Sequence, residues 1–132
     1  MDFTTTDLEY ARPDGQPLGA TLYKPTGTGP FPAVVEIHGG AWTSGDRFNN
    51  KVIAEYLAAR GVVVFSIDFR LPPDATYPAV VADINYGIRW FKQRATEFGT
   101  TPALTGALGT SSGGHMLLLN VLRPTQIGRA HV

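Results

Sequence analysis

The stretch that begins at Gly109, GTSSGGHMLLL, places Ser111 in the pattern G-x-S-x-G. Gly109 and Gly113 stand two positions before and after Ser111, whereas Ser112 has the β-branched Thr110 two positions before it. A strand that turns sharply into a helix needs small residues at both places, because the two backbones come close, and the turn lifts the hydroxyl at its apex above the sheet. We therefore expect Ser111 to be the nucleophile of an acyl-transfer reaction.

A second stretch, HGGAW, begins at His38. Gly39 and Gly40 leave backbone amides open to a ligand with no side chain in the way. This loop and Ser111 each follow a predicted strand, and the carboxyl ends of parallel strands meet at one edge of a sheet, where open α/β sheets place their sites. We expect amides of the loop and of Ser112 to form an oxyanion hole. His38 itself is expected to be a structural imidazole that hydrogen-bonds the loop backbone.

Other catalytic chemistries lack their residues. The serine turn is followed by no Gly-Lys-Ser/Thr, and neither G-x-G-x-x-G nor H-E-x-x-H occurs, so phosphate-loop, dinucleotide and zinc sites are not supported. The chain has 0 cysteines, which excludes disulfides, thiolate catalysis and cysteine-bound metal. We expect no cofactor and no metal.

Composition points to one globular domain. The 132 residues carry 43 % hydrophobic and 17 % charged residues, with 11 basic against 11 acidic side chains and no block of either sign. This balance argues against nucleic-acid and membrane-surface partners, since both favour a basic patch. The first ten residues, MDFTTTDLEY, lack the basic and apolar regions of a signal peptide, so we expect a cytoplasmic location.

The elements that must position these residues alternate between strand and helix. Patterns of β-branched, apolar and turn residues predict an antiparallel hairpin and then three strands, each followed by a helix. This order predicts an α/β fold, with a mostly parallel sheet that has helices on both faces and an N-terminal antiparallel hairpin. The predicted strands are 8–11, 18–24, 33–38, 62–69 and 103–109, and the predicted helices are about 48–60, 79–97 and 111–122.

Two helices show an apolar face. In the first, Val52, Ile53, Tyr56 and Leu57 share one side. In the second, apolar residues recur at spacings of four, four and three, which predicts one buried stripe. The members of that stripe are Val80, Ile84, Ile88 and Phe91.

Four motifs follow one another along the chain: HGGAW, SIDFRL, YPAVVADINYGIRWF and GTSSGGH. In their order and spacing, they resemble the α/β-hydrolase superfamily, in its hormone-sensitive-lipase-like and BD-FAE-type esterase branch. The resemblance covers roughly residues 20–122. It implies an incomplete α/β-hydrolase fold and a serine hydrolase acting on carboxylic esters. It further implies that Ser111 is the nucleophile and that Gly40, Ala41 and Ser112 lend oxyanion amides. Ala41 stands where the family usually has a third glycine, and alanine keeps the backbone amide that the oxyanion hole needs.

Structural roles are expected for Arg70, Asp83 and Glu36. Arg70 and Asp83 match family positions, and we expect an ion pair that holds the loop after SIDF to the following helix. The family places its catalytic acid much later in the chain, which argues against Asp68 in that role. Glu36, inside an apolar strand, is expected to be a paired buried carboxylate.

The proton acceptor of Ser111 is expected outside this sequence. In the superfamily the acid and then the histidine follow the serine in the chain. The 3 histidines are His38, which precedes the serine, His115, four residues along its helix, and His131. The closing IGRAHV matches the in-frame translation of a common sequencing adapter, so we expect residues 127–132 to be a non-native tail and residues 1–126 the N-terminal part of a hydrolase domain. Such a chain would be inactive by itself.

Two alternatives stay open at this point. One is a non-catalytic binding module that kept the hydrolase fold, which the presence of both an intact serine turn and an intact oxyanion loop disfavours. The other is a related acyl-peptidase or arylformamidase, whose substrate preference depends on pocket residues.

Overall fold

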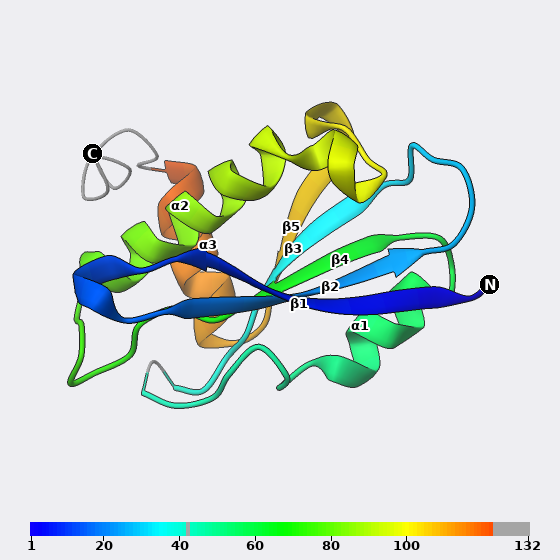
Figure 1. Cartoon of the computed structure of the whole chain (residues 1–132). Helices are drawn as coiled ribbons and strands as arrows, with labels where there is room; N and C mark the ends of the chain where they lie inside the picture. The colour runs from blue at the N-terminus through cyan, green and yellow to red at the C-terminus, as the bar shows by residue number, and fades with distance from the viewer. Residues whose placement is uncertain (42, 123–132) are drawn as a thin grey trace.

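The computed structural model describes residues 1–41 and 43–122, so His131 and the expected tail at 127–132 lie outside the described residues. Within the described part, the strands form one mixed sheet in the order β1-β2-β4-β3-β5 (Figure 1). The strands are β1 (Phe3–Ala11), β2 (Leu18–Pro25), β3 (Ala33–Ile37), β4 (Val63–Ile67) and β5 (Thr105–Gly109).

The pairing of the strands sets where the sheet can carry a site. β1 and β2 form the expected antiparallel hairpin, and β2 also pairs antiparallel with β4. The three strands β4, β3 and β5 run parallel, and their ends are level, because Ile37 of β3 is paired with Ile67 of β4 and with Gly109 of β5. The loop after β3 and the turn after β5 therefore leave the sheet at the same edge, as the sequence predicts.

Helices cover both faces of the sheet (Figure 1), which confirms the α/β class. The helix α1 packs on one face against β2 and β4, whereas α2 and α3 pack on the other. The side chains of β4 are buried along its whole length, as expected for a strand covered on both faces. None of the helices in the described part of the chain has the length and apolar character that a bilayer crossing needs. The helices are α1 (Lys51–Ala58), α2 (Ala79–Gln93) and α3 (Ser112–Leu122).

The apolar face predicted for α1 packs on the sheet only in part. Val52 is 81% exposed and Tyr56 is 57% exposed, whereas Ala54 and Ala58 are fully buried and Leu57 is half-buried against the same core. The small side chains let the helix backbone approach the strands closely. Periodicity locates the apolar residues on one face but does not show which side of the helix packs on the sheet.

The stripe predicted for α2 is confirmed. Val80, Ile84 and Phe91 are buried and Ile88 is half-buried against the same core. The helix ends at Gln93, and a 3₁₀ turn over 95–98 continues the segment that the sequence assigned to helix up to residue 97.

Candidate active site

Ser111 occupies the apex between β5 and α3 and is exposed. Its φ is 52°, in the left-handed region that non-glycine residues rarely adopt. Such a conformation costs about 1–3 kcal/mol and persists only where the surroundings enforce it. The turn thus holds the serine hydroxyl out of the sheet in a strained backbone geometry.

The two glycines around the apex lie where no side chain fits. A Cβ on Gly109 would lie 2.7 Å from the Cα of Gly114, in the first turn of α3. A Cβ on Gly113 would lie 2.3 Å from the carbonyl oxygen of Ile37 and 2.5 Å from that of His38. The close approach of strand and helix expected from the glycine spacing is therefore present, and it extends to β3.

The HGG loop lies directly against this turn. A Cβ on Gly39 would lie 2.8 Å from the carbonyl oxygen of Thr110 and 3.1 Å from the Cβ of Ser111. The amide of Thr110 donates to the carbonyl of Ile37 at 3.2 Å, which extends the pairing of the strands up to the turn. The structure thus brings the loop and Ser111 together at one point of the sheet edge.

The peptide that joins Gly39 to Gly40 is anchored through its oxygen. The Gly39 carbonyl accepts from Nδ1 of His38 at 2.7 Å and from Nδ2 of Asn49 at 3.1 Å. A trans peptide is planar, and its N–H points opposite to its C=O. Fixing the carbonyl therefore turns the amide of Gly40 away from His38 and Asn49.

The next peptide of the loop is anchored in the same way. The Gly40 carbonyl accepts from the amides of Thr43 and Ser44 and from the Ser44 hydroxyl, each at 3.1 Å. Gly40 has a φ of 141° and Ala41 a φ of 54°, so the loop folds back tightly at these two residues. Among the described residues, the amides of the three residues from 39 to 41 donate to no backbone carbonyl.

A further amide comes from the start of α3. The Ser111 carbonyl accepts from the amides of Gly114 at 3.0 Å and His115 at 3.3 Å, so the amide of Ser112 points out of the helix. It is one of the first-turn amides that a helix leaves without an intrahelical acceptor, where the helix dipole is positive. The side chain of Ser112 is 3% exposed, so its hydroxyl is not presented to solvent as that of Ser111 is.

The two described histidines have different surroundings. His38 is 1% exposed, stacks on Phe69 with ring centroids 4.3 Å apart and holds the Gly39 carbonyl, as expected for a structural imidazole. His115 is exposed on α3, where it lines an apolar groove.

The carboxylates near the site are held by defined partners. Both oxygens of Asp68 are engaged by Arg47, one by its amide at 2.7 Å and one by its guanidinium at 2.6 Å. Asp83 is fully buried and accepts the backbone amide and the guanidinium of Arg70 at 2.8–2.9 Å, which confirms the expected ion pair. These contacts give Asp68 and Asp83 structural roles.

Glu36 is buried as expected, and its partner is neutral. Its Oε2 accepts from Nδ2 of Asn50 at 2.8 Å, and no cation meets it among the described residues. Burial raises the pKa of the Glu36 carboxyl, and the hydrogen bond from Asn50 opposes this in part.

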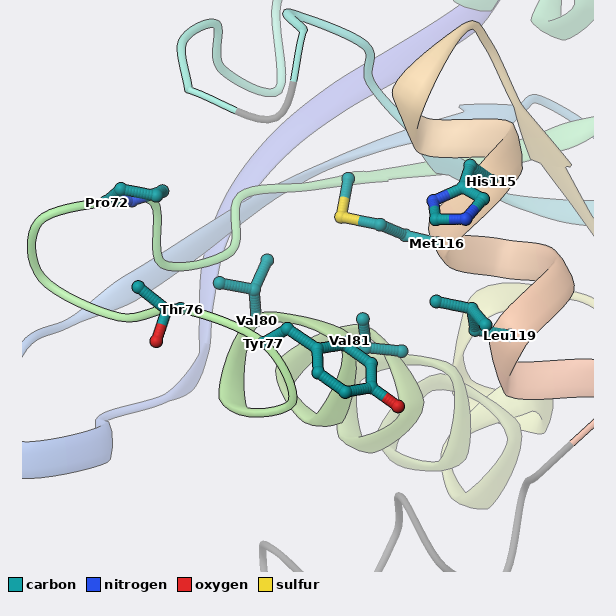
Figure 2. A pocket seen from close by; sticks show the side chains of 8 residues that line it. All are labelled: Pro72, Thr76, Tyr77, Val80, Val81, His115, Met116 and Leu119. Carbon is teal, nitrogen blue, oxygen red and sulfur yellow. The ribbon is translucent and has the colours of Figure 1, made fainter.

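A groove of about 500 Å³ lies beside the start of α3, between α3, the first turn of α2 and the loop that precedes α2 (Figure 2). Its size falls in the range of small-molecule sites. Figure 2 shows side chains from both helices turned toward this space. The sequence did not predict the groove, because its residues come from segments that are neighbours only after folding. The lining residues are Pro72, Thr76, Tyr77, Val80, Val81, His115, Met116 and Leu119.

No group of three or more His, Cys, Asp or Glu side chains that could hold a metal occurs among the described residues. Sequence reasoning also missed Asn49 and Asn50, which contact the HGG loop and the serine turn. The only sequence signal was their place just before a predicted helix, where asparagine is common for a different reason.

Comparisons with known proteins show the family of this chain. The sequence profile of the BD-FAE family matches residues 21–127. The chain is 35% identical over 113 residues to the carboxylic ester hydrolase LipN of Mycobacterium tuberculosis, a match that covers 84% of this chain and 30% of LipN. It is also 35% identical over 102 residues to the versiconal hemiacetal acetate esterase of Dothistroma septosporum, covering 74% of this chain and 30% of that enzyme.

Solved structures of esterases share the fold. Thermogutta terrifontis esterase 2 superposes with a TM-score of 0.82 at 32% identity, over 88% of this chain and 45% of the esterase. An esterase of Pyrobaculum calidifontis superposes with a TM-score of 0.83 at 28% identity, over 95% of this chain and 40% of the esterase. The chain thus spans less than half the length of the proteins it matches.

Proposed function

This chain belongs to the BD-FAE family of α/β-hydrolase carboxylic-ester hydrolases, and we propose that it carries the nucleophile and the oxyanion hole of a serine carboxylesterase. The observation that carries the proposal is the exposed, strained Ser111 with the Gly39 backbone packed against its Cβ. The contact between the HGG loop and the serine turn, together with loop amides that donate to no backbone carbonyl among the described residues, supports the proposal.

The reaction follows from this arrangement. The Oγ of Ser111 bonds to the carbonyl carbon of the ester while its proton passes to a base, and the carbonyl electron pair becomes an oxyanion. The amides of Gly40, Ala41 and Ser112 donate to that oxyanion, with Gly39 completing the loop, and one such donor is typically worth about 3 kcal/mol of barrier. Collapse of the intermediate breaks the bond to the alcohol, which leaves with a proton, and water then hydrolyses the acyl-serine by the same route.

We assign the base and its supporting acid to residues beyond these 132, in a protein of the length its relatives have. LipN is matched over 30% of its length, so most of such a protein would lie outside the present sequence. The contacts of the described residues support this assignment, since His38 is buried on the loop backbone and Asp68 is bound by Arg47.

The groove supports a substrate with an apolar group. Its walls are mainly aliphatic and aromatic, and His115 on its wall lies one helical turn from Ser111. An ester bound at Ser111 can therefore extend an apolar acyl or alcohol group between α2 and α3. The expected substrate is a small carboxylic ester.

Hydrolysis of p-nitrophenyl acetate tests the proposal. A protein that continues this chain to the length of its relatives, called the longer gene product below, should hydrolyse it. Ser111→Ala should lose nearly all turnover, and Thr6→Ala, which removes an exposed hydroxyl from β1, is the matched control. The 132-residue chain should be barely faster than its own Ser111→Ala variant. Full turnover in Ser111→Ala would refute the nucleophile, and Ser111-dependent cleavage of an acyl-peptide or aryl formamide without ester hydrolysis would identify a related amide-cleaving enzyme.

A further inference from the structure

Asn50 stands at the position that precedes α1, yet its side chain does not cap the helix. Asparagine is among the residues preferred there, because its side-chain oxygen can accept from the free amides of the first turn, and such a cap is typically worth about 1 kcal/mol. The α1 helix lacks this contact. The Asn50 side chain must therefore be engaged elsewhere.

The Asn50 amide group bridges two segments that are distant in sequence. Its Nδ2 donates to Oε2 of Glu36 at 2.8 Å and to Oγ1 of Thr110 at 3.0 Å. Glu36 lies inside β3, and Thr110 directly precedes Ser111. One side chain thus links the middle of the sheet to the residue that enters the serine turn.

Glu36, which anchors this bridge, is buried at a cost in folding free energy. Glu36 is 1% exposed, and its Oε1 has no hydrogen-bond partner among the described residues, although the Ser66 hydroxyl on the paired strand is close enough to lower the pKa of the carboxyl. Burying a carboxyl group without a full set of partners destabilises a fold. A neutral apolar residue at this place in β3 would serve the core better, so stability does not account for either Glu36 or the direction of Asn50.

We propose that Asn50, anchored on Glu36, is a positioning residue that fixes the Thr110–Ser111 turn against the HGG loop; this rests on the proposed role of Ser111. Asn50 does not touch the reacting atoms. It holds the hydroxyl of Thr110, and through it the backbone that carries Ser111 in the left-handed conformation.

The neighbouring side chain holds the other half of the site. Nδ2 of Asn49 donates to the Gly39 carbonyl, whose peptide directs the amide of Gly40. Two consecutive asparagines therefore set the serine turn and the oxyanion loop from the same short segment. A change of about 1 Å in the relation between nucleophile and oxyanion donors typically costs on the order of 100-fold in rate.

The decisive variant is Asn50→Ser, made in the longer gene product. Serine caps helices as well as asparagine does, so α1 can gain its missing cap, but serine is too short to reach both Glu36 and Thr110. We expect a lower midpoint of urea unfolding, because the buried Glu36 carboxyl loses the donor of its hydrogen bond, together with a kcat lowered by about 10- to 100-fold and little change in KM. A residue with only a structural role would lower the midpoint and leave the kcat of the folded enzyme unchanged.

Two further variants complete the test. Thr110→Val removes the hydroxyl and keeps the branched shape, and it should lower kcat about as much as Asn50→Ser. The double variant should be no slower than either single one, since both break the same contact. Asn85→Ser is the matched control, because it shortens an asparagine on α2 that accepts from Nε of Arg89 at 2.8 Å, away from the serine turn.

The outcomes separate this inference from the proposed function. If Ser111→Ala keeps full activity, the nucleophile assignment fails. If activity depends on Ser111 but Asn50→Ser and Thr110→Val both keep the kcat of Asn85→Ser, the positioning role is wrong. If Asn50→Ser does not fold, Thr110→Val decides alone: a lowered kcat in a stable protein supports the role, and an unchanged kcat overturns it.

Discussion

The substitution Gly113→Ala should disrupt the close contact between α3 and the end of β3, on which the serine turn depends. The new Cβ would lie 2.3 Å from the carbonyl oxygen of Ile37 and 2.5 Å from that of His38, both backbone atoms that cannot rotate away. Non-bonded carbon and oxygen atoms approach to about 3.3 Å, so the start of α3 must move by about 1 Å from β3. Such overpacking should lower the free energy of unfolding by about 3 kcal/mol.

The same movement should also lower activity, because the amide of Ser112 and the turn at Ser111 are carried by the displaced residues. A shift of about 1 Å corresponds to a loss on the order of 100-fold in kcat. Gly106→Ala is the matched control, since a Cβ there meets nothing within 4 Å. Urea unfolding and p-nitrophenyl acetate hydrolysis of both variants of the longer gene product measure the two effects. Equal stability and equal kcat in the two variants would refute the steric reasoning.

Three further predictions concern the ion pair, the buried carboxyl and the groove. Asp83→Asn should lower the free energy of unfolding by about 3 kcal/mol, because the guanidinium of Arg70 loses its buried, charged partner. Asp14→Asn is the control: Asp14 pairs with the same arginine but is 92% exposed, so this variant should keep the urea midpoint of the wild type. Burial raises the pKa of Glu36, so as the pH rises above about 4.5 the carboxyl ionises first in the unfolded chain, and the stability of the wild type falls. In urea titrations between pH 4 and 7, the stability of Glu36→Gln should fall less with pH than that of the wild type. The same dependence of stability on pH in both proteins would contradict this prediction. Leu119→Trp should narrow the groove and lower kcat/KM for p-nitrophenyl octanoate more than for the acetate, and equal losses would place the apolar group elsewhere.

The layout of the fold was predictable because it depends on local patterns. Alternating strand and helix patterns fix a parallel sheet, and parallel strands bring the residues that follow them to one edge. The glycine spacing around Ser111 was equally informative, since it reports the close approach of two backbones, seen at Gly113 against the Ile37 carbonyl. The ion pair of Arg70 and Asp83 was expected from the family resemblance.

The features that the sequence did not predict depend on direction and on distant contacts. The fully buried residues of α1 are Ala54 and Ala58, because close packing favours small residues over the larger apolar ones nearby. Asn50 has the sequence position of a helix cap. Only the fold shows that its side-chain amide donates a hydrogen bond to the hydroxyl of Thr110, 60 positions later in the chain. The groove forms between α2 and α3 for the same reason, from segments that meet only in the folded chain.

Reaction of the longer gene product with paraoxon tests the central claim most directly. The Oγ of Ser111 should bond to phosphorus as p-nitrophenolate leaves, and peptide mass mapping should find one diethyl phosphate, on Ser111, together with release of one p-nitrophenolate per chain and loss of esterase activity. Loss of activity with the phosphate on any other residue, or an esterase that stays active and unmodified, would contradict the assignment of Ser111 as the nucleophile.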